Sequence, residues 1–143
     1  MYKKILVTLE NSPADKAILP HAAEFAKRFG SELLLLHVAD GWRARNFNQL
    51  GLRESSEMIE DREYLEKVAA ELRREGFSVS TMLALGEPPL EILKAAESEQ
   101  CHLIAMAGHG HRLFGDIFHG STITEVRHRT RIPLLVVRAE KKR

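Results

Sequence analysis

Short apolar segments alternate with longer amphipathic segments along the chain. Five segments have the length and apolar content of buried strands: residues 4–9, 33–38, 77–85, 103–107 and 134–137. Between them, apolar residues recur at helical spacing over residues 14–29, 54–75, about 88–96 and about 121–129. Single strands that alternate with single helices are typical of βαβ units and a parallel sheet. With right-handed crossovers, the pattern predicts a five-stranded, doubly wound α/β sheet of strand order 3-2-1-4-5, with helices on both faces.

The ends of these elements carry their own signals. Ser12 is a good N-cap for the first helix, Pro13 suits its first turn, and Asp15 stands where the acid of a capping box would. Gly30 supplies a left-handed stop. Residues 39–52 show no hydrophobic period, and we interpret them as a mobile loop.

Composition narrows the class of protein. A chain of 143 residues corresponds to one domain, which we place over residues 1–143. Lys and Arg number 21 against 20 Asp and Glu, and the net charge of +1 gives no general attraction to nucleic acid or to an anionic membrane. One cysteine rules out an internal disulfide, and no apolar run is long enough for a signal peptide or a membrane span. We therefore expect a cytoplasmic protein without nucleic-acid or membrane partners.

The segment after the fourth predicted strand carries most of the candidate chemistry. Glycines at positions 108, 110, 115 and 120 allow backbone amides to approach a phosphate closely. The predicted helix start at Ser121 and Thr122 adds unpaired amides, two hydroxyls and the positive end of the helix dipole, and His111 and Arg112 are candidate partners for negative charge. The segment fits an anion site. It equally fits a tight connection in which Thr122 and Glu125 form a capping box.

On these residues the chain resembles the universal stress protein family. The resemblance runs through nearly the whole chain and includes residues 4–12, His37-Val38, Gly86-Glu87-Pro88 with Ile92, and the last strand with its lead-in, residues 132–137. Its most specific part is the loop pattern Gly-x2-Gly-x9-Gly-Ser/Thr, whose last two glycines are Gly110 and Gly120, followed by Ser121.

The ATP-binding branch of that family implies an adenine nucleotide across the ends of the first and fourth strands. By this resemblance, the residues that line the adenine and ribose would be Thr8, Leu9, Glu10 and Val38. Those that pass close to the ribose and phosphates would be Met106, Gly108 and Gly110, and those that hold the phosphate tail would be His111, Arg112, Gly120, Ser121 and Thr122. A divalent cation, Mg²⁺ or Mn²⁺, would accompany the triphosphate.

Two residues depart from the family pattern. Ala107 replaces the first glycine of the loop pattern, at a cost on the order of 1 kcal/mol or more if that position needs a positive φ. Glu10 stands where the family usually has aspartate, and its side chain is one methylene longer. These departures support an alternative: a dimeric interaction module of the same fold that does not bind nucleotide.

The sequence arranges no catalytic group. It lacks a Walker lysine motif, the Ser-Gly-Gly-x-Asp-Ser loop of related ATP pyrophosphatases, and the acidic pair and lysine of response-regulator receivers. Cys101 has only the adjacent His102 beside it, and we interpret it as an ordinary thiol. We therefore predict a nucleotide-binding regulatory protein rather than an enzyme, with any ATP hydrolysis slow.

Three further features have simple interpretations. His37, on an apolar strand, is expected to be a core or edge histidine whose ring nitrogens are satisfied. The histidines at positions 109, 111 and 119 lack ligand spacing, so we expect no metal site. The basic residues from Arg127 to Arg143 have no interleaved aromatic residues, and we expect a solvated surface there.

The last strand predicts self-association. As an edge strand, residues Leu134 to Val137 present unpaired backbone groups that a second copy can bury by antiparallel pairing in twofold symmetry. The family resemblance also implies a dimer. We expect a homodimer through this strand, and a regulatory protein partner that the sequence does not identify.

Overall fold

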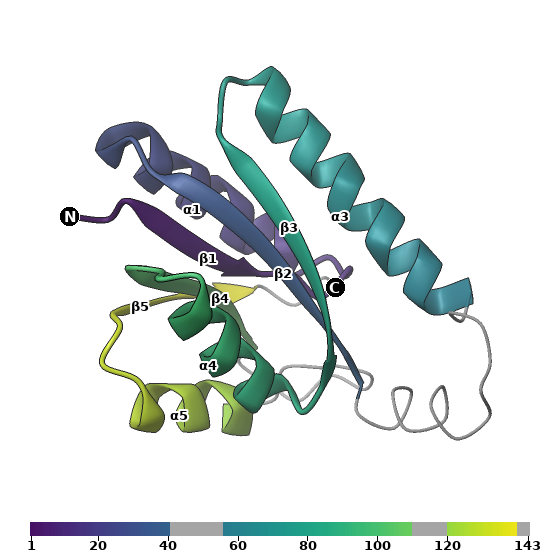
Figure 1. The fold of residues 1–143 in the computed structure, drawn as a ribbon, viewed down its shortest axis with the longest axis vertical. Coiled ribbons are helices and arrows are strands. Elements are labelled where there is room, and N and C mark those ends of the chain that lie inside the picture. The colour runs from purple at the N-terminus through teal and green to yellow at the C-terminus, as the bar shows by residue number, and fades with distance from the viewer. Residues whose placement is uncertain (41–55, 110–119, 140–143) are drawn as a thin grey trace.

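A computed structural model of the chain describes residues 1–40, 56–109 and 120–139 (Figure 1). Strands and helices alternate through these ranges, as the sequence predicts. In chain order the elements are β1 (Lys4–Thr8), α1 (Asp15–Phe29), β2 (Glu32–Asp40), α3 (Ser56–Arg74), β3 (Val79–Gly86), α4 (Pro88–Ser98), β4 (Leu103–His109), α5 (Gly120–Arg129) and β5 (Leu134–Ala139).

The strands form one parallel sheet of order β3-β2-β1-β4-β5, which confirms the predicted fold class and strand order. β1 lies at the centre, where Val7 pairs with Leu35 of β2 on one side and with Ala105 of β4 on the other. β3 and β5 are the edges. Residues 5–8 of this central strand are buried, as their apolar sequence requires.

Each face of the sheet is covered by its own pair of helices, as Figure 1 shows. α1 and α3 pack on one face, where the buried cluster includes Ile18, Leu65 and Leu103. α4 and α5 pack on the other face, against Leu6, Leu36 and other strand residues that alternate along the chain with those facing α1 and α3. None of the described helices is long and apolar enough to cross a membrane.

Three strands, β2, β4 and β5, each end two residues later than their apolar runs suggest. β2 continues through Ala39 and Asp40, which pair with Leu85 and Gly86, so the predicted loop 39–52 is wrong for its first two residues. Its remainder lies outside the described residues. β4 likewise reaches His109, opposite Ala139. Ladder pairing with a neighbouring strand extends a strand beyond the residues that hydrophobicity marks.

The first helix begins at Asp15, with Ala14 at the N-cap and no side-chain cap hydrogen bond, so the predicted N-cap at Ser12 is wrong. Ser12 Oγ accepts a hydrogen bond from the Ala14 amide at 3.2 Å, and the turn tightens through backbone bonds such as Asp15 N to Ser12 O before α1 begins. Gly30 ends α1 with φ 64°, the predicted left-handed stop. The β1–α1 connection is therefore short and tightly held.

Candidate functional site

The carboxyl ends of β1 and β4 lie side by side at the centre of the sheet. The chain leaves β1 toward α1 on one face and leaves β4 toward α5 on the other. This reversal is the topological switch point at which open α/β sheets bind ligands. The structure therefore places the predicted strand-end residues beside the crevice expected for a ligand.

Three of the four predicted strand-end side chains share one face. Val38 and Met106 are buried in the cluster under α4 and α5. Thr8, also buried, donates from Oγ1 to the carbonyl of Ala105 at 3.5 Å. Leu9 is different, because its side chain belongs to the cluster under α1 and α3. Leu9 can therefore line the predicted site only through its backbone.

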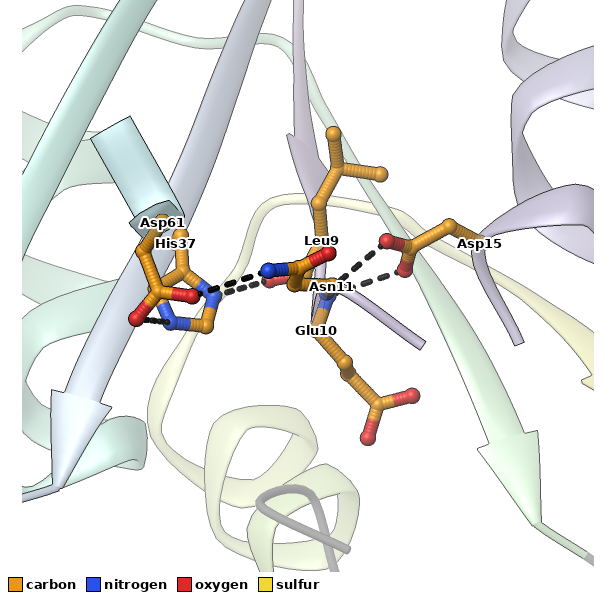
Figure 2. A network of polar contacts seen from close by, with 6 residues as sticks. All are labelled: Leu9, Glu10, Asn11, Asp15, His37 and Asp61. Atoms are coloured by element: carbon orange, nitrogen blue, oxygen red, sulfur yellow. Dashed lines mark hydrogen bonds and ion pairs between the residues drawn. The ribbon is translucent and has the colours of Figure 1, made fainter. Parts of the chain in front are cut away.

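Glu10 is a buried acid directly after β1, only 6% exposed. Its backbone amide donates to Asp15 Oδ1 at 2.8 Å. Figure 2 shows its side chain leaving the turn away from Asp15, His37 and Asp61. The extra methylene is thus accommodated without disturbing the polar contacts behind the turn.

The structure removes one objection that the sequence raised. Ala107 lies within β4, buried in the cluster under α1 and α3, and is not among the residues of positive φ. An alanine therefore carries no left-handed strain at this position. Its neighbour Gly108 has a packing reason to be glycine, because a Cβ there would lie 2.9 Å from Val136 Cγ1 and 3.5 Å from Ile123 Cδ1.

The predicted phosphate side is described only in part. Gly110, His111 and Arg112 lie outside the described residues. α5 begins at Gly120, so Ser121 and Thr122 lie in its first turn rather than at the N-cap, and the predicted capping box of Thr122 with Glu125 is wrong. Thr122 is buried.

The start of α5 is well placed for an anion. α5 connects two neighbouring parallel strands, so it runs against them and begins near the carboxyl end of β4. Its first amides have no partners within the helix, and they carry the positive end of the helix dipole.

A buried polar network lies behind the Leu9–Asn11 turn (Figure 2). His37 is 1% exposed, with Nδ1 2.8 Å from the Leu9 carbonyl and Nε2 3.0 Å from Asp61 Oδ2. The core position of His37 is confirmed, and Nδ1 has its hydrogen-bond partner. Nε2 meets Asp61 Oδ2 as a close charge contact without a hydrogen bond, so the expectation that both ring nitrogens are satisfied is wrong for Nε2. Asp61 Oδ1 in turn accepts from the Asn11 side-chain amide at 3.1 Å.

The sequence analysis missed Asp61, although a signal was present. Asp61 falls on the apolar stripe of α3, three residues after Met58 and four before Leu65, both of which are buried. A charged residue on such a stripe indicates a buried partner. That partner is His37, on the neighbouring strand.

Asp15 does more than the predicted capping acid. Its carboxylate accepts from the amides of Glu10 and Asn11 at 2.8 and 2.9 Å and from the Tyr64 hydroxyl at 2.6 Å. Burial raises the pKa of Asp15, and the hydrogen bonds from Tyr64, Glu10, Asn11 and Ser12 offset part of that rise. Burial also raises the pKa of Tyr64, which keeps its hydroxyl a donor.

The structure supports the interpretation of Cys101 as an ordinary thiol. Cys101 is buried, and burial raises the pKa of its thiol to about 11, which disfavours the thiolate that a nucleophile needs. Within residues 1–40, 56–109 and 120–139, no group of three or more His, Cys, Asp or Glu side chains is placed to hold a metal ion. The arginines at 127, 129, 131 and 138 are exposed, as a solvated surface requires.

A model of the universal stress protein family matches residues 1–138. The chain belongs to this family. Universal stress protein MJ0577 of Methanocaldococcus jannaschii is 32% identical over 155 residues, which cover 96% of each protein. The solved structure of MJ0577 superposes with a TM-score of 0.79 at 30% identity and 99% coverage of both chains. The resemblance inferred from the loop pattern is therefore confirmed.

Two solved universal stress proteins with this fold hold adenine nucleotides. The protein from Archaeoglobus fulgidus in complex with dAMP matches with a TM-score of 0.69 and 24% identity, covering 95% of this chain and 98% of that one. A universal stress protein in complex with cAMP matches with a TM-score of 0.67 and 14% identity, covering 96% of this chain and 97% of that one. At these identities the matches concern the fold.

Proposed function

We propose that this universal stress protein binds an adenine nucleotide, ATP, at the carboxyl ends of β1 and β4 and acts as a regulatory protein. The observation that carries the proposal is the meeting of the β1 and β4 ends with the start of α5 at the switch point of the sheet. That arrangement offers an interior for a purine on one side and helix amides for phosphates on the other. Complexes of the same fold with dAMP and cAMP support the choice of adenine nucleotides.

The purine side of the proposed site comes from β1, β2 and β4. Val38 and Met106 are the apolar residues at these strand ends, and Thr8 and Glu10 are the polar ones; all four are buried in this structure. The Leu9 backbone completes this side. A ribose offers hydroxyls that a carboxylate accepts, so the polar chemistry of Glu10 fits a nucleoside.

The phosphate side of the proposed site comes from the loop pattern and α5. By the family resemblance, its residues are Gly108, Gly110, His111, Arg112, Gly120, Ser121 and Thr122. Main-chain amides and the α5 dipole fit phosphate oxygens. Mg²⁺ or Mn²⁺ bound to the triphosphate would supply the remaining positive charge.

Binding rather than turnover is the proposed activity. Figure 2 shows the Glu10 side chain pointing away from Asp15 and Asp61, the other two acids drawn at the turn, so these acids form no pair with Glu10 that could activate water. ATP hydrolysis is therefore proposed to be slow or absent, and the bound nucleotide to control an interaction with a regulatory protein partner.

We also propose a homodimer through β5. This strand is the edge of the sheet beside β4, and its Val136 is 45% exposed. Pairing with a second copy would cover this valine and satisfy the edge backbone groups of residues 134–137.

The competing function is a dimeric interaction module without nucleotide. Glu10 favours it, because the longer side chain places a buried carboxylate closer to the purine than an aspartate would. The desolvation cost of that carboxylate is therefore higher than the cost for an aspartate. The two functions differ in one measurable property, which is the affinity for ATP.

Mass spectrometry of the natively purified protein, together with thermal unfolding in ATP or GTP, tests the proposed function. We expect a retained adenine nucleotide or a higher Tm in millimolar ATP with a smaller shift in GTP. Arg112→Ala should reduce the ATP shift, whereas Arg131→Ala, at an exposed arginine outside the site, should preserve it. The absence of both a retained nucleotide and a Tm shift in ATP would contradict the proposal.

A further inference from the structure

The turn after β1 is held from behind by a buried pair of side chains from two other elements. His37 of β2 reaches the Leu9 carbonyl, and Asp61 of α3 reaches the Asn11 side-chain amide. His37 and Asp61 meet each other at 3.0 Å. The pair therefore joins the residue before Glu10 to the residue after it (Figure 2).

The atoms fix the direction of these contacts. A carbonyl oxygen only accepts, so His37 Nδ1 carries the proton that it gives to Leu9. Asn11 Nδ2 is a donor, so the Asp61 oxygen that faces it is an acceptor. These two hydrogen bonds, joined by the close approach of His37 Nε2 to Asp61 Oδ2, connect Leu9 to Asn11 across the back of the turn, and an apolar pair of the same volume could not form them.

Asn11 shows why the turn needs support. Its φ is 60°, in the left-handed region that side chains other than asparagine, aspartate and glycine seldom adopt. Such a conformation persists where surrounding contacts over-determine it. Here the backbone amide of Asn11 donates a hydrogen bond to Asp15, and its side-chain amide donates one to Asp61. These two bonds fix the path of the backbone through Glu10.

We propose that His37 and Asp61 are positioning residues of the nucleotide site, and that they set the direction in which the Glu10 carboxylate projects. The inference rests on the proposed function, because it gives the pair a role toward the ligand. The Glu10 side chain leaves the turn away from the pair, so the pair acts on it through the backbone of the turn (Figure 2). The proposal makes α3 part of the support of a site to which α3 contributes no ligand-facing group.

Three substitutions separate positioning from simple stabilisation. Asp61→Ala removes both contacts of the carboxylate. Asp61→Asn keeps an oxygen for Asn11 and offers an amide hydrogen to His37 Nε2, so it restores both contacts without the charge. Val68→Ala is the matched control, since Val68 is buried on the same helix two turns further on and loses apolar contacts only.

Isothermal titration with ATP is carried out at a temperature where all variants are folded. Asp61→Ala should weaken ATP binding about tenfold or more, because loss of a residue that positions a ligand-contacting side chain typically has an effect of this size. Asp61→Asn should stay within about threefold of the native protein, and Val68→Ala should bind like the native protein despite its lower Tm. Equal affinities for Asp61→Ala and Val68→Ala would overturn the proposal, as would an Asp61→Asn protein that binds as weakly as Asp61→Ala.

Hydrogen exchange of the free protein separates this proposal from the proposed function. If the native protein binds no ATP, the proposed function fails. The positioning role is then tested by the hydrogen-exchange rates of the backbone amides of Glu10 and Asn11. Positioning predicts that Asp61→Ala accelerates exchange of these two amides relative to both the native protein and Val68→Ala. Unchanged exchange at these amides would overturn it.

Discussion

The hydroxyl of Tyr64 donates a 2.6 Å hydrogen bond to Oδ2 of Asp15. Tyr64 lies on α3 and Asp15 opens α1, so the bond joins the two helices of one sheet face beside the β1–α1 turn. Burial raises the pKa of Asp15, and this hydrogen bond is the strongest influence in the opposite direction. The ionised carboxylate therefore depends on Tyr64.

Tyr64→Phe should lower the free energy of unfolding by about 1–2 kcal/mol near neutral pH, because a buried acceptor loses its donor. A carboxyl whose folded pKa is raised contributes stability below its unfolded pKa of 3.8 and loses it as pH rises through the folded pKa. Loss of the hydroxyl raises the folded pKa of Asp15 further. The deficit of the variant should thus grow as pH rises from about 4 to about 7.

Urea denaturation of the native protein and the variant at both pH values measures this deficit. Tyr2→Phe is the control, because Tyr2 packs its ring against Phe25 and Phe29 rather than against Asp15. A deficit for Tyr64→Phe that shrinks as pH rises, or that Tyr2→Phe reproduces, would contradict this reading of Asp15.

Gly108→Ala should destabilise the protein by about 1–3 kcal/mol, because its Cβ would overlap the stiff side chain of Val136 across the β4–β5 pair. Val136→Ala in the same chain should recover most of that loss, since the clashing methyl is gone. Denaturant titration of both single variants and the double variant gives the coupling. Strictly additive effects would mean that Gly108 is required for another reason.

The sequence predicts the fold well because the strands here are buried on both faces. Apolar runs such as Leu33 to Val38 indicate buried parallel strands when they alternate with amphipathic helices. Right-handed crossovers in a doubly wound sheet then lead to the observed strand order. Strand ends are less predictable, since Ala39 and Asp40 are extended by pairing with β3 rather than by their own hydrophobicity.

The site is predictable only in part, for a geometric reason. The sequence shows which residues follow β1 and β4. It does not show the sheet face on which each side chain lies, and the Leu9 side chain packs under α1 and α3. The contact of His37 with Asp61 joins residues 24 positions apart on different elements. Only the packing of α3 against β2 brings them together.

The proposed homodimer is tested by Val136→Glu. A carboxylate on the exposed valine of β5 should convert a dimer to a monomer in sedimentation velocity at micromolar concentration, while the fold remains intact by circular dichroism. Ile59→Glu is a matched control, because Ile59 on α3 is 44% exposed and lies away from β5. A native monomer at this concentration, or a dimer that tolerates Val136→Glu, would contradict the β5 interface.

Cys101 should react slowly with a thiol reagent in the folded protein. Its pKa of about 11 leaves roughly one thiolate in several thousand at pH 7.5, and burial blocks access as well. We expect modification by a chromogenic disulfide to be more than about a hundredfold slower than in urea, and to accelerate as pH approaches 11. Rapid modification of the folded protein at neutral pH would show an activated cysteine instead.

Isothermal titration of ATP into the native protein, with Mg²⁺ present, tests nucleotide binding most directly. Saturable binding of one ATP per chain is expected. Ala107→Gly should change the affinity little, because Ala107 does not use the left-handed region. The contradicting result is an absence of heat for the native protein at millimolar ATP, together with ATP binding by the Glu10→Asp, Ala107→Gly double variant. That result would mean that Glu10 and Ala107 close the site and that the protein works without a nucleotide.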